Sequence, residues 1–205
     1  MSHRLLPETI LRGHTGEAQS LSFTQNGNLL LCGDSAGAVR VWDLQTARTE
    51  AAVNAHSEDA RVLQVRARGA VVITQGRDGE MCLWDLARDS SLRRVRSIFK
   101  EECYNFCKCC VPRCTASSEN HRHSLAAAGM GNKGVQIVDW REGGAVLLCH
   151  GEEHHGMSMC LDLPDLAQPV VLAGCGKNAH FPWHFSFNGN TVTQLYTHDL
   201  PCAHT

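Results

Sequence analysis

Features that mark membrane-spanning, secreted or nucleic-acid-binding proteins are missing from this sequence of 205 residues. No apolar run approaches the ~18 residues needed to cross a bilayer, and residues 1–8 lack the apolar core of a signal peptide. Lysines and arginines are scattered, and the net charge is -2, which argues against a nucleic-acid footprint. We therefore expect a soluble protein of the cytoplasm and nucleus that binds neither nucleic acid nor membrane. The 11 cysteines are then expected to be reduced thiols.

The motifs of common enzyme classes are missing as well. No nucleophile with a base, and no pair of carboxylates, stands in a recognisable pattern. The glycine-rich run at 129–134 lacks the Lys-Ser/Thr ending of a phosphate-binding loop. We expect a protein with no catalytic activity and no cofactor.

What the sequence does contain is a repeat. Residues 75–86 read Gln-Gly-Arg-Asp-Gly-Glu-Met-Cys-Leu-Trp-Asp-Leu, and residues 33–44 are an earlier copy. His14 precedes Trp42 by 28 positions and His56 precedes Trp84 by the same 28, so both pairs repeat with a period of 42. A glycine-rich turn before a strand that ends in Trp-Asp, with a period of about 40–45, is typical of the WD40 repeat, which forms one blade of a β-propeller.

Resemblance to WD40 repeats implies a buried relay of hydrogen bonds in each blade. An Asp in the turn accepts from the His, the His meets a hydroxyl on the second strand, and that hydroxyl meets the indole N–H. The second repeat supplies all four members, which are His56, Thr74, Asp78 and Trp84. In the first repeat Cys32 replaces the hydroxyl and Ala36 replaces the Asp, so its weaker equivalents are His14, Trp42 and Asp43. We expect a structural role for all of them, and a first blade held mainly by packing.

Alternation of apolar and polar residues predicts the strands of successive blades. Two blades are predicted at 18–23, 29–32, 38–42, 49–53, 61–67, 70–74, 80–84 and 92–99, after a short outer strand at 9–12. A degenerate third is predicted at 105–111, 124–128, 135–138 and 145–149, and a fourth begins at 156–163 and 169–173. The predicted fold is all-β, a partial WD40 propeller of about three and a half blades. Because a closed ring needs about four to eight blades, its edge should be exposed unless the chain pairs with another copy.

The predicted domain organisation is an incomplete propeller at 1–174 and a divergent tail at 175–205. The tail has neither a Gly-x-Asp-Gly turn nor a Trp-Asp strand. We interpret it as a segment of different coding origin, for example an alternative terminus. The other interpretation is a hairpin around Asn188-Gly189-Asn190, since Asn-Gly favours tight turns.

Longer strings narrow the resemblance. Residues 74–79 and 81–86, then Asn105-Phe106-Cys107, then 156–161 and 169–174, occur in this order in the guanine nucleotide-binding protein subunit beta-like protein 1 family. That family is similar to the ASTRA-associated WD40 proteins of fungi. The resemblance covers residues 10–174 and implies a non-enzymatic scaffold for protein partners. The implied partners are chaperone-adaptor complexes and phosphatidylinositol 3-kinase-related kinases, and hence DNA-damage signalling.

Two other functions stay open. One is a truncated isoform with little activity. The other is a zinc-binding regulatory module, because five cysteines precede His121 and His123 and offer ligand types that suit Zn²⁺, although their spacing matches no common zinc finger. These cysteines are Cys103, Cys107, Cys109, Cys110 and Cys114. Cys107 and Cys109 also fit one face of a half-buried strand.

Overall fold

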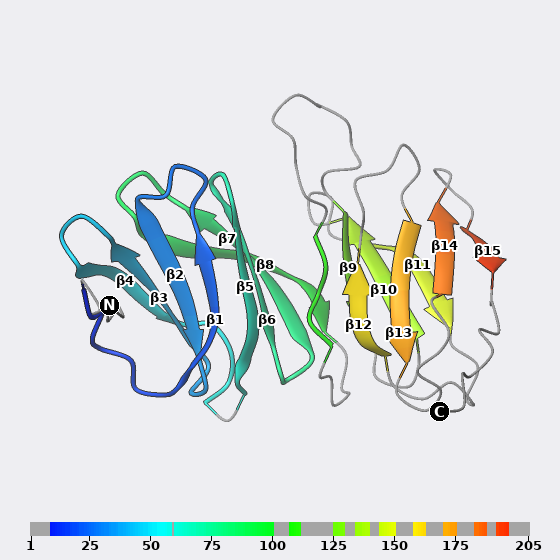
Figure 1. The fold of residues 1–205 in the computed structure, drawn as a ribbon, viewed down its shortest axis with the longest axis horizontal. Coiled ribbons are helices and arrows are strands. Elements are labelled where there is room, and N and C mark those ends of the chain that lie inside the picture. Colours follow the sequence, from blue (N-terminus) through cyan, green and yellow to red (C-terminus); the bar gives the residue numbers. More distant parts are fainter. Residues whose placement is uncertain are drawn as a thin grey trace, which may run out of the picture. The chain divides into compact units, whose positions relative to one another are not determined.

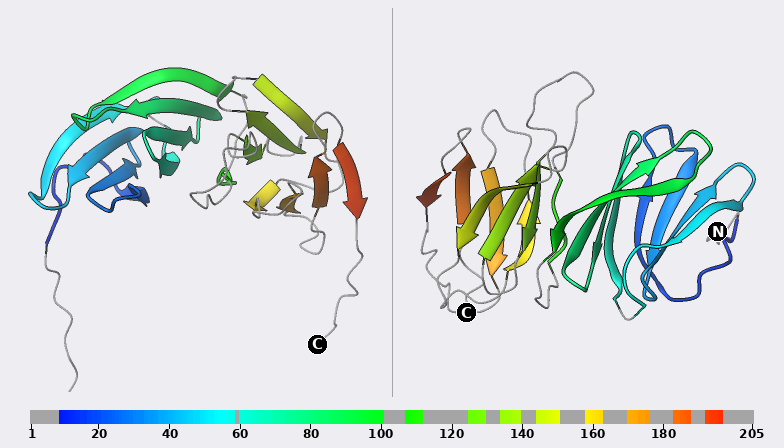
Figure 2. Two further views of the ribbon diagram at one scale, coloured as in Figure 1. Left: turned by 90° about the horizontal axis from the view of Figure 1, so that it is seen from above. Right: turned by 180° about the vertical axis from the view of Figure 1, so that it is seen from behind.

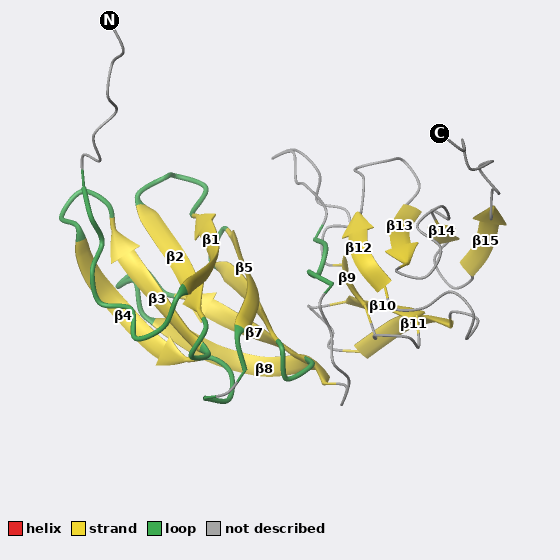
Figure 3. Cartoon of the chain, turned by 60° about the horizontal axis from the view of Figure 1, so that its bottom comes forward, coloured by secondary structure: helices red, strands yellow, loops and turns green. Residues whose placement is uncertain are grey.

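The computed structural model describes residues 9–58, 60–100, 107–111, 125–129, 134–139, 144–150, 158–162, 170–175, 183–187 and 192–196. Within these ranges every regular element is a strand (Figure 3). No helix long and apolar enough to cross a membrane occurs in the described part of the chain. The chain divides into two units, one of Met1–Gly76 and Cys82–Arg96 and the other of Arg77–Met81 and Ser97–Thr205.

The strands form four sheets, and within each sheet neighbours follow chain order (Figure 1). The first sheet contains β1 (Ala18–Phe23), β2 (Leu29–Asp34), β3 (Ala38–Asp43) and β4 (Arg48–Asn54). The second contains β5 (Val62–Arg68), β6 (Val71–Gly76), β7 (Glu80–Leu86) and β8 (Leu92–Lys100). The third contains β9 (Leu125–Gly129), β10 (Gly134–Asp139) and β11 (Gly144–His150). The fourth contains β12 (Ser158–Asp162), β13 (Val170–Cys175), β14 (Trp183–Phe187) and β15 (Val192–Tyr196).

This arrangement confirms the predicted all-β class and the blade plan of the first two repeats. All eight strands of the first two sheets begin within one residue of the predicted position. The turn glycines Gly37 and Gly79, which are 42 residues apart, have φ values of 84° and 74°. Only glycine adopts such angles at no steric cost, so each repeat makes the same turn. Seen from above, the outer strands β4 (cyan) and β8 (green) lie along the outer margin of their sheets (Figure 2).

Three segments differ from the strand prediction. Residues 9–12 form no strand, and no described strand pairs with them. Of the strand predicted at 105–111, residues 107–111 are described, and only Cys110 takes part in a β-bridge. In the tail, β14 pairs with β13 and β15 pairs with β14, so two segments beyond residue 174 complete the fourth sheet. The antiparallel pairing of β14 with β15, on either side of residues 188–191, agrees with the hairpin interpretation of the tail. Sheet ladders use backbone groups, and these two segments can form them without a Trp-Asp motif.

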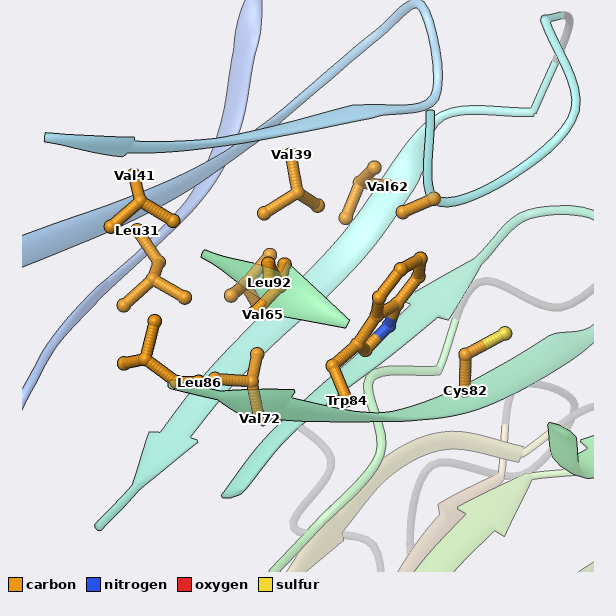
Figure 4. Close-up of a cluster of buried hydrophobic side chains, with 11 residues drawn as sticks. Leu31, Val39, Val41, Val62, Val65, Val72, Cys82, Trp84, Leu86 and Leu92 are labelled. Atoms are coloured by element: carbon orange, nitrogen blue, oxygen red, sulfur yellow. The ribbon is translucent and has the colours of Figure 1, made fainter. Parts of the chain in front are cut away.

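The core of the first unit lies between its two sheets (Figure 4). One side is formed by buried side chains of the first sheet, including Leu31, Val39 and Val41, and the other by side chains of the second sheet, including Val62, Val65, Val72 and Trp84. Burying each such side chain contributes roughly 1.5–3 kcal/mol. Valine is the most frequent residue in this cluster, because β-branched side chains suit a pleated surface that is covered on one face.

The innermost strands of the two sheets, β1 and β5, lie side by side (Figures 1 and 3). The hydroxyl of Ser20 accepts the N–H of Val65 at 3.0 Å, and the hydroxyl of Ser22 accepts the N–H of Ala67 at 3.0 Å. Gly33 permits the close approach, because a Cβ added there would lie 3.0 Å from Val65 Cγ2 and closer still to Val62. Sheet-to-sheet contact therefore combines apolar packing with hydrogen bonds to an otherwise free strand edge.

Candidate functional site

Three members of the predicted relay come together in the second sheet. His56 Nε2 lies 3.0 Å from Thr74 Oγ1, and the indole N–H of Trp84 donates to the same oxygen at 2.9 Å. All three residues are buried. Because the indole can only donate, Thr74 accepts from Trp84 and keeps its own O–H for the imidazole.

Local structure explains how the three side chains meet. Thr74 lies on β6 and Trp84 on β7, neighbouring strands of the sheet, while His56 lies in the connection from β4 to β5. That connection is anchored at Gly37, whose carbonyl accepts the N–H groups of Ala55 and His56 at 3.0 Å each. The relay thus ties the connection to two strands.

The fourth predicted member, Asp78, lies in the turn before β7 and belongs to the other unit. Its Oδ1 accepts the N–H of Glu80 at 3.1 Å. This bond closes the turn locally in the way Asp side chains commonly do.

The first repeat has an acid that the sequence analysis missed. His14 Nδ1 lies 3.2 Å from Asp34 Oδ2, and Asp34 is fully buried. The other oxygen, Oδ1, accepts the N–H groups of Ala36 and Ala38 at 3.0 Å each. Ala36 does occupy the place of Asp78, but Asp34, two residues earlier, supplies the carboxylate. The available signal was an acid at the end of the second strand, 20 residues after His14.

The first repeat lacks the hydrogen bond from the tryptophan that completes the relay of the second. Trp42 is buried, and its Nε1 has no hydrogen-bond partner. The ring of His14 lies over it, with the ring centroids 4.6 Å apart. Cys32 stands where Thr74 stands in the next repeat, and its thiol contacts the carbonyl of Gly33 at 3.7 Å.

Cys32 is not poised for chemistry. Burial raises the pKa of the Cys32 thiol to about 11, and the nearby charge of Asp34 adds to the shift. A thiol acts as a nucleophile only after it loses its proton. Cys32 therefore stays protonated near neutral pH and behaves as a small apolar side chain.

Asp43, the acid of the first Trp-Asp pair, holds the turn between β3 and β4. Its Oδ1 accepts the N–H groups of Gln45 and Thr46 at 2.8 Å each. The bond from Thr46 is the main reason that the pKa of Asp43 is lowered. Its role is local and is separate from the buried relay.

The cysteine cluster is only partly described. Cys103, Cys114, His121 and His123 lie outside the described residues. Cys107 and Cys109 are buried with exposed Lys108 between them, and Cys110 is half-buried. Cys107 and Cys110 have the Cys-x-x-Cys spacing of a ligand pair, so zinc binding stays an untested alternative.

The geometry of the relay favours a structural role. A catalytic group must reach a substrate, whereas His56, Thr74 and Trp84 are all buried. Each hydrogen bond satisfies a polar atom that would otherwise cost about 1–3 kcal/mol when buried. The relay holds the strands of the blade together.

These sheets and their relay have the arrangement of the blades of a WD40 β-propeller. The family "WD domain, G-beta repeat" matches residues 6–43. The chain is 28% identical over 206 residues to the guanine nucleotide-binding protein subunit beta-like protein 1 of Mus musculus, covering 95% of this chain and 61% of that protein. It is 40% identical over 82 residues to ASTRA-associated protein 1 of Verticillium alfalfae, covering 40% of this chain and 20% of that protein. The chain is thus homologous to both proteins at modest identity and spans less than two thirds of either.

Solved structures show the same fold. The WD40 repeats of RRP9 superpose with a TM-score of 0.66 at 14% identity, covering 92% of this chain and 53% of that one. The computationally designed Ika4 protein superposes with a TM-score of 0.61 at 16% identity, covering 90% of this chain and 99% of that one. Blades of this kind therefore occur both in chains of this length and in chains about twice as long.

Proposed function

We propose that the chain is a non-enzymatic WD40 adaptor that acts with chaperone-adaptor complexes in the maturation of phosphatidylinositol 3-kinase-related kinases. The supporting observation is its 40% identity, over 82 residues, to a relative named for its association with ASTRA. An adaptor of this kind would work in the cytoplasm and the nucleus. WD40 proteins as a class are interaction scaffolds, and this more specific role rests on that relationship.

Physical features of the first unit suit a scaffold. A packed core and a buried relay hold the strands, so loops at the sheet ends can present side chains without rearranging the framework. Glu58 in the connection from β4 to β5 and Arg88 in the turn from β7 to β8 are both exposed. Binding energy at such surfaces is usually concentrated in a few residues.

The test is capture of purified partners by the immobilised 205-residue chain. We expect a chaperone-adaptor component or a phosphatidylinositol 3-kinase-related kinase to be retained above the level seen with an unrelated propeller of similar length. Glu58→Arg and Arg88→Glu each reverse an exposed charge at a different loop, so a loss with one variant alone would identify the binding loop. Retention equal to the unrelated propeller for every component would refute the proposal.

A further inference from the structure

The inner strand of the first sheet carries two large apolar side chains in water. Leu21 and Phe23 on β1 are 57% and 61% exposed. They lie opposite Cys32 and Leu30 of β2, and they share one face of the sheet because alternate residues of a strand point to the same side. Exposed apolar residues that share a face commonly mark an interaction surface.

The second sheet shows what covers this face. Val65 pairs with Thr74 in the second sheet, and Leu21 pairs with Cys32 in the first. Because Cys32 lies 42 residues before Thr74, one repeat period, Val65 and Leu21 occupy equivalent positions in their sheets. By the same comparison Ala67 is equivalent to Phe23. Yet Val65 is fully buried, because the first sheet packs on it.

Contact with Val65 depends on two features of the first sheet. The hydroxyl of Ser20 accepts its N–H, and Gly33 leaves room for its side chain. Ser20 and Gly33 are partners in the β1–β2 ladder, next to a register shift. A sheet that covers Leu21 should therefore have a small polar residue on its innermost strand, paired with a glycine on the next strand.

The fourth sheet has this arrangement. Cys160 on β12 pairs with Gly174 on β13, next to a register shift at the corresponding place in the ladder. Cys160 is exposed. The described residues thus contain both halves of a sheet-to-sheet contact, an uncovered β1 edge and a counterpart on the sheet of β12 to β15.

We infer that the Leu21 and Phe23 face of β1 binds the β12–β13 edge of a second copy of this chain. The inference is independent of the proposed chaperone role. Each copy would supply one edge to each of two identical contacts. This pairing would cover the apolar face and leave no free inner strand in either contact.

Light scattering during size-exclusion chromatography tests the inference on the full chain. We expect a mass twice the 22.5 kDa of one chain. The double variant L21D/F23D should halve that mass while keeping its β-sheet circular dichroism, since both side chains are exposed. Val95→Asp is the matched control, because Val95 is 54% exposed on the outer strand β8, and it should leave the dimer intact. A wild-type monomer, or a polydisperse aggregate, would overturn the inference.

A disulfide trap identifies the contact itself and does not depend on the charged variants. Leu21→Cys should form an intermolecular disulfide with Cys160 on mild oxidation, giving a dimer on non-reducing gels. The dimer band should vanish in L21C/C160S, and Val95→Cys should not produce it. A band that persists without Cys160, or no band with Leu21→Cys, would contradict the assigned pairing.

Discussion

Cys32 and Thr74 occupy equivalent positions in neighbouring repeats, yet only Thr74 bonds the tryptophan beside it. Trp84 has its partner at 2.9 Å, whereas the buried Nε1 of Trp42 has none. A buried donor without a partner costs about 1–3 kcal/mol. The first repeat therefore carries a local defect that a single hydroxyl would correct.

Replacing Cys32 by threonine should stabilise the chain. The new hydroxyl would accept from Trp42 and lie next to His14, as Thr74 does between Trp84 and His56, and we expect a gain of about 1 kcal/mol. Urea unfolding followed by tryptophan fluorescence measures it. Cys32→Val has a similar shape but no hydroxyl, and an equal gain with valine would refute the explanation.

The converse change in the second repeat should destabilise it. Thr74→Val leaves the indole N–H of Trp84 and Nε2 of His56 without the shared oxygen, at an expected cost of about 1–3 kcal/mol. Thr74→Ser keeps the oxygen and should lose less. The same unfolding measurement applies, and equal losses for valine and serine would mean that packing rather than hydrogen bonding sets the effect.

Much of the relay follows from the resemblance to WD40 repeats, because His56, Thr74 and Trp84 stand at the places in the repeat where that resemblance implies relay members. Asp34 does not follow. One oxygen of its carboxylate accepts the N–H groups of Ala36 and Ala38 in the following turn, and the other contacts His14. Aligning the two repeats places Ala36 at the position of Asp78. The alignment therefore misses Asp34, which lies two residues earlier and contacts His14.

At the scale of elements, the contact between β1 and β5 joins the first two sheets. The hydroxyls of Ser20 and Ser22 on β1 accept hydrogen bonds from backbone N–H groups of β5. S20A/S22A removes both acceptors and should destabilise the chain by about 1 kcal/mol per hydrogen bond. Amide hydrogen exchange at Val65 and Ala67 of β5 should accelerate, whereas exchange in the neighbouring strand β6 should change less. Unchanged protection at both amides would show that packing alone protects this edge.

The turn between β3 and β4 should contribute a pH-dependent part of the stability. The pKa of Asp43 is lowered by hydrogen bonds, chiefly from the Thr46 N–H. A carboxyl with a lowered pKa in the folded state stabilises it above its unfolded pKa of about 4, and the contribution is lost as pH falls through the folded pKa. Asp43→Asn should therefore reduce the decline of the melting temperature between about pH 5 and about pH 2. An identical decline in both proteins would contradict this role.

Strands with a clear alternating pattern were predictable, and those without one were not. Burial on one face produces the alternation, so β1 to β8 could be placed from sequence to within a residue at their starts. At 107–111 the alternation of buried Cys107 and Cys109 with exposed Lys108 is present, but a strand also needs a neighbour, and only Cys110 is bridged. The strands β14 and β15 lack the repeat motif, and the only sequence signal for their pairing was the Asn-Gly turn between them.

At the scale of the whole molecule, the account turns on whether an uncovered blade edge is filled by a second copy. The most direct measurement is thermal unfolding of the 205-residue chain across a hundredfold range of protein concentration. A dimer of the native state makes the melting temperature depend on concentration, so we predict one cooperative transition that moves upward as concentration rises and that becomes independent of concentration in L21D/F23D. A wild-type melting temperature that does not change with concentration would contradict the account.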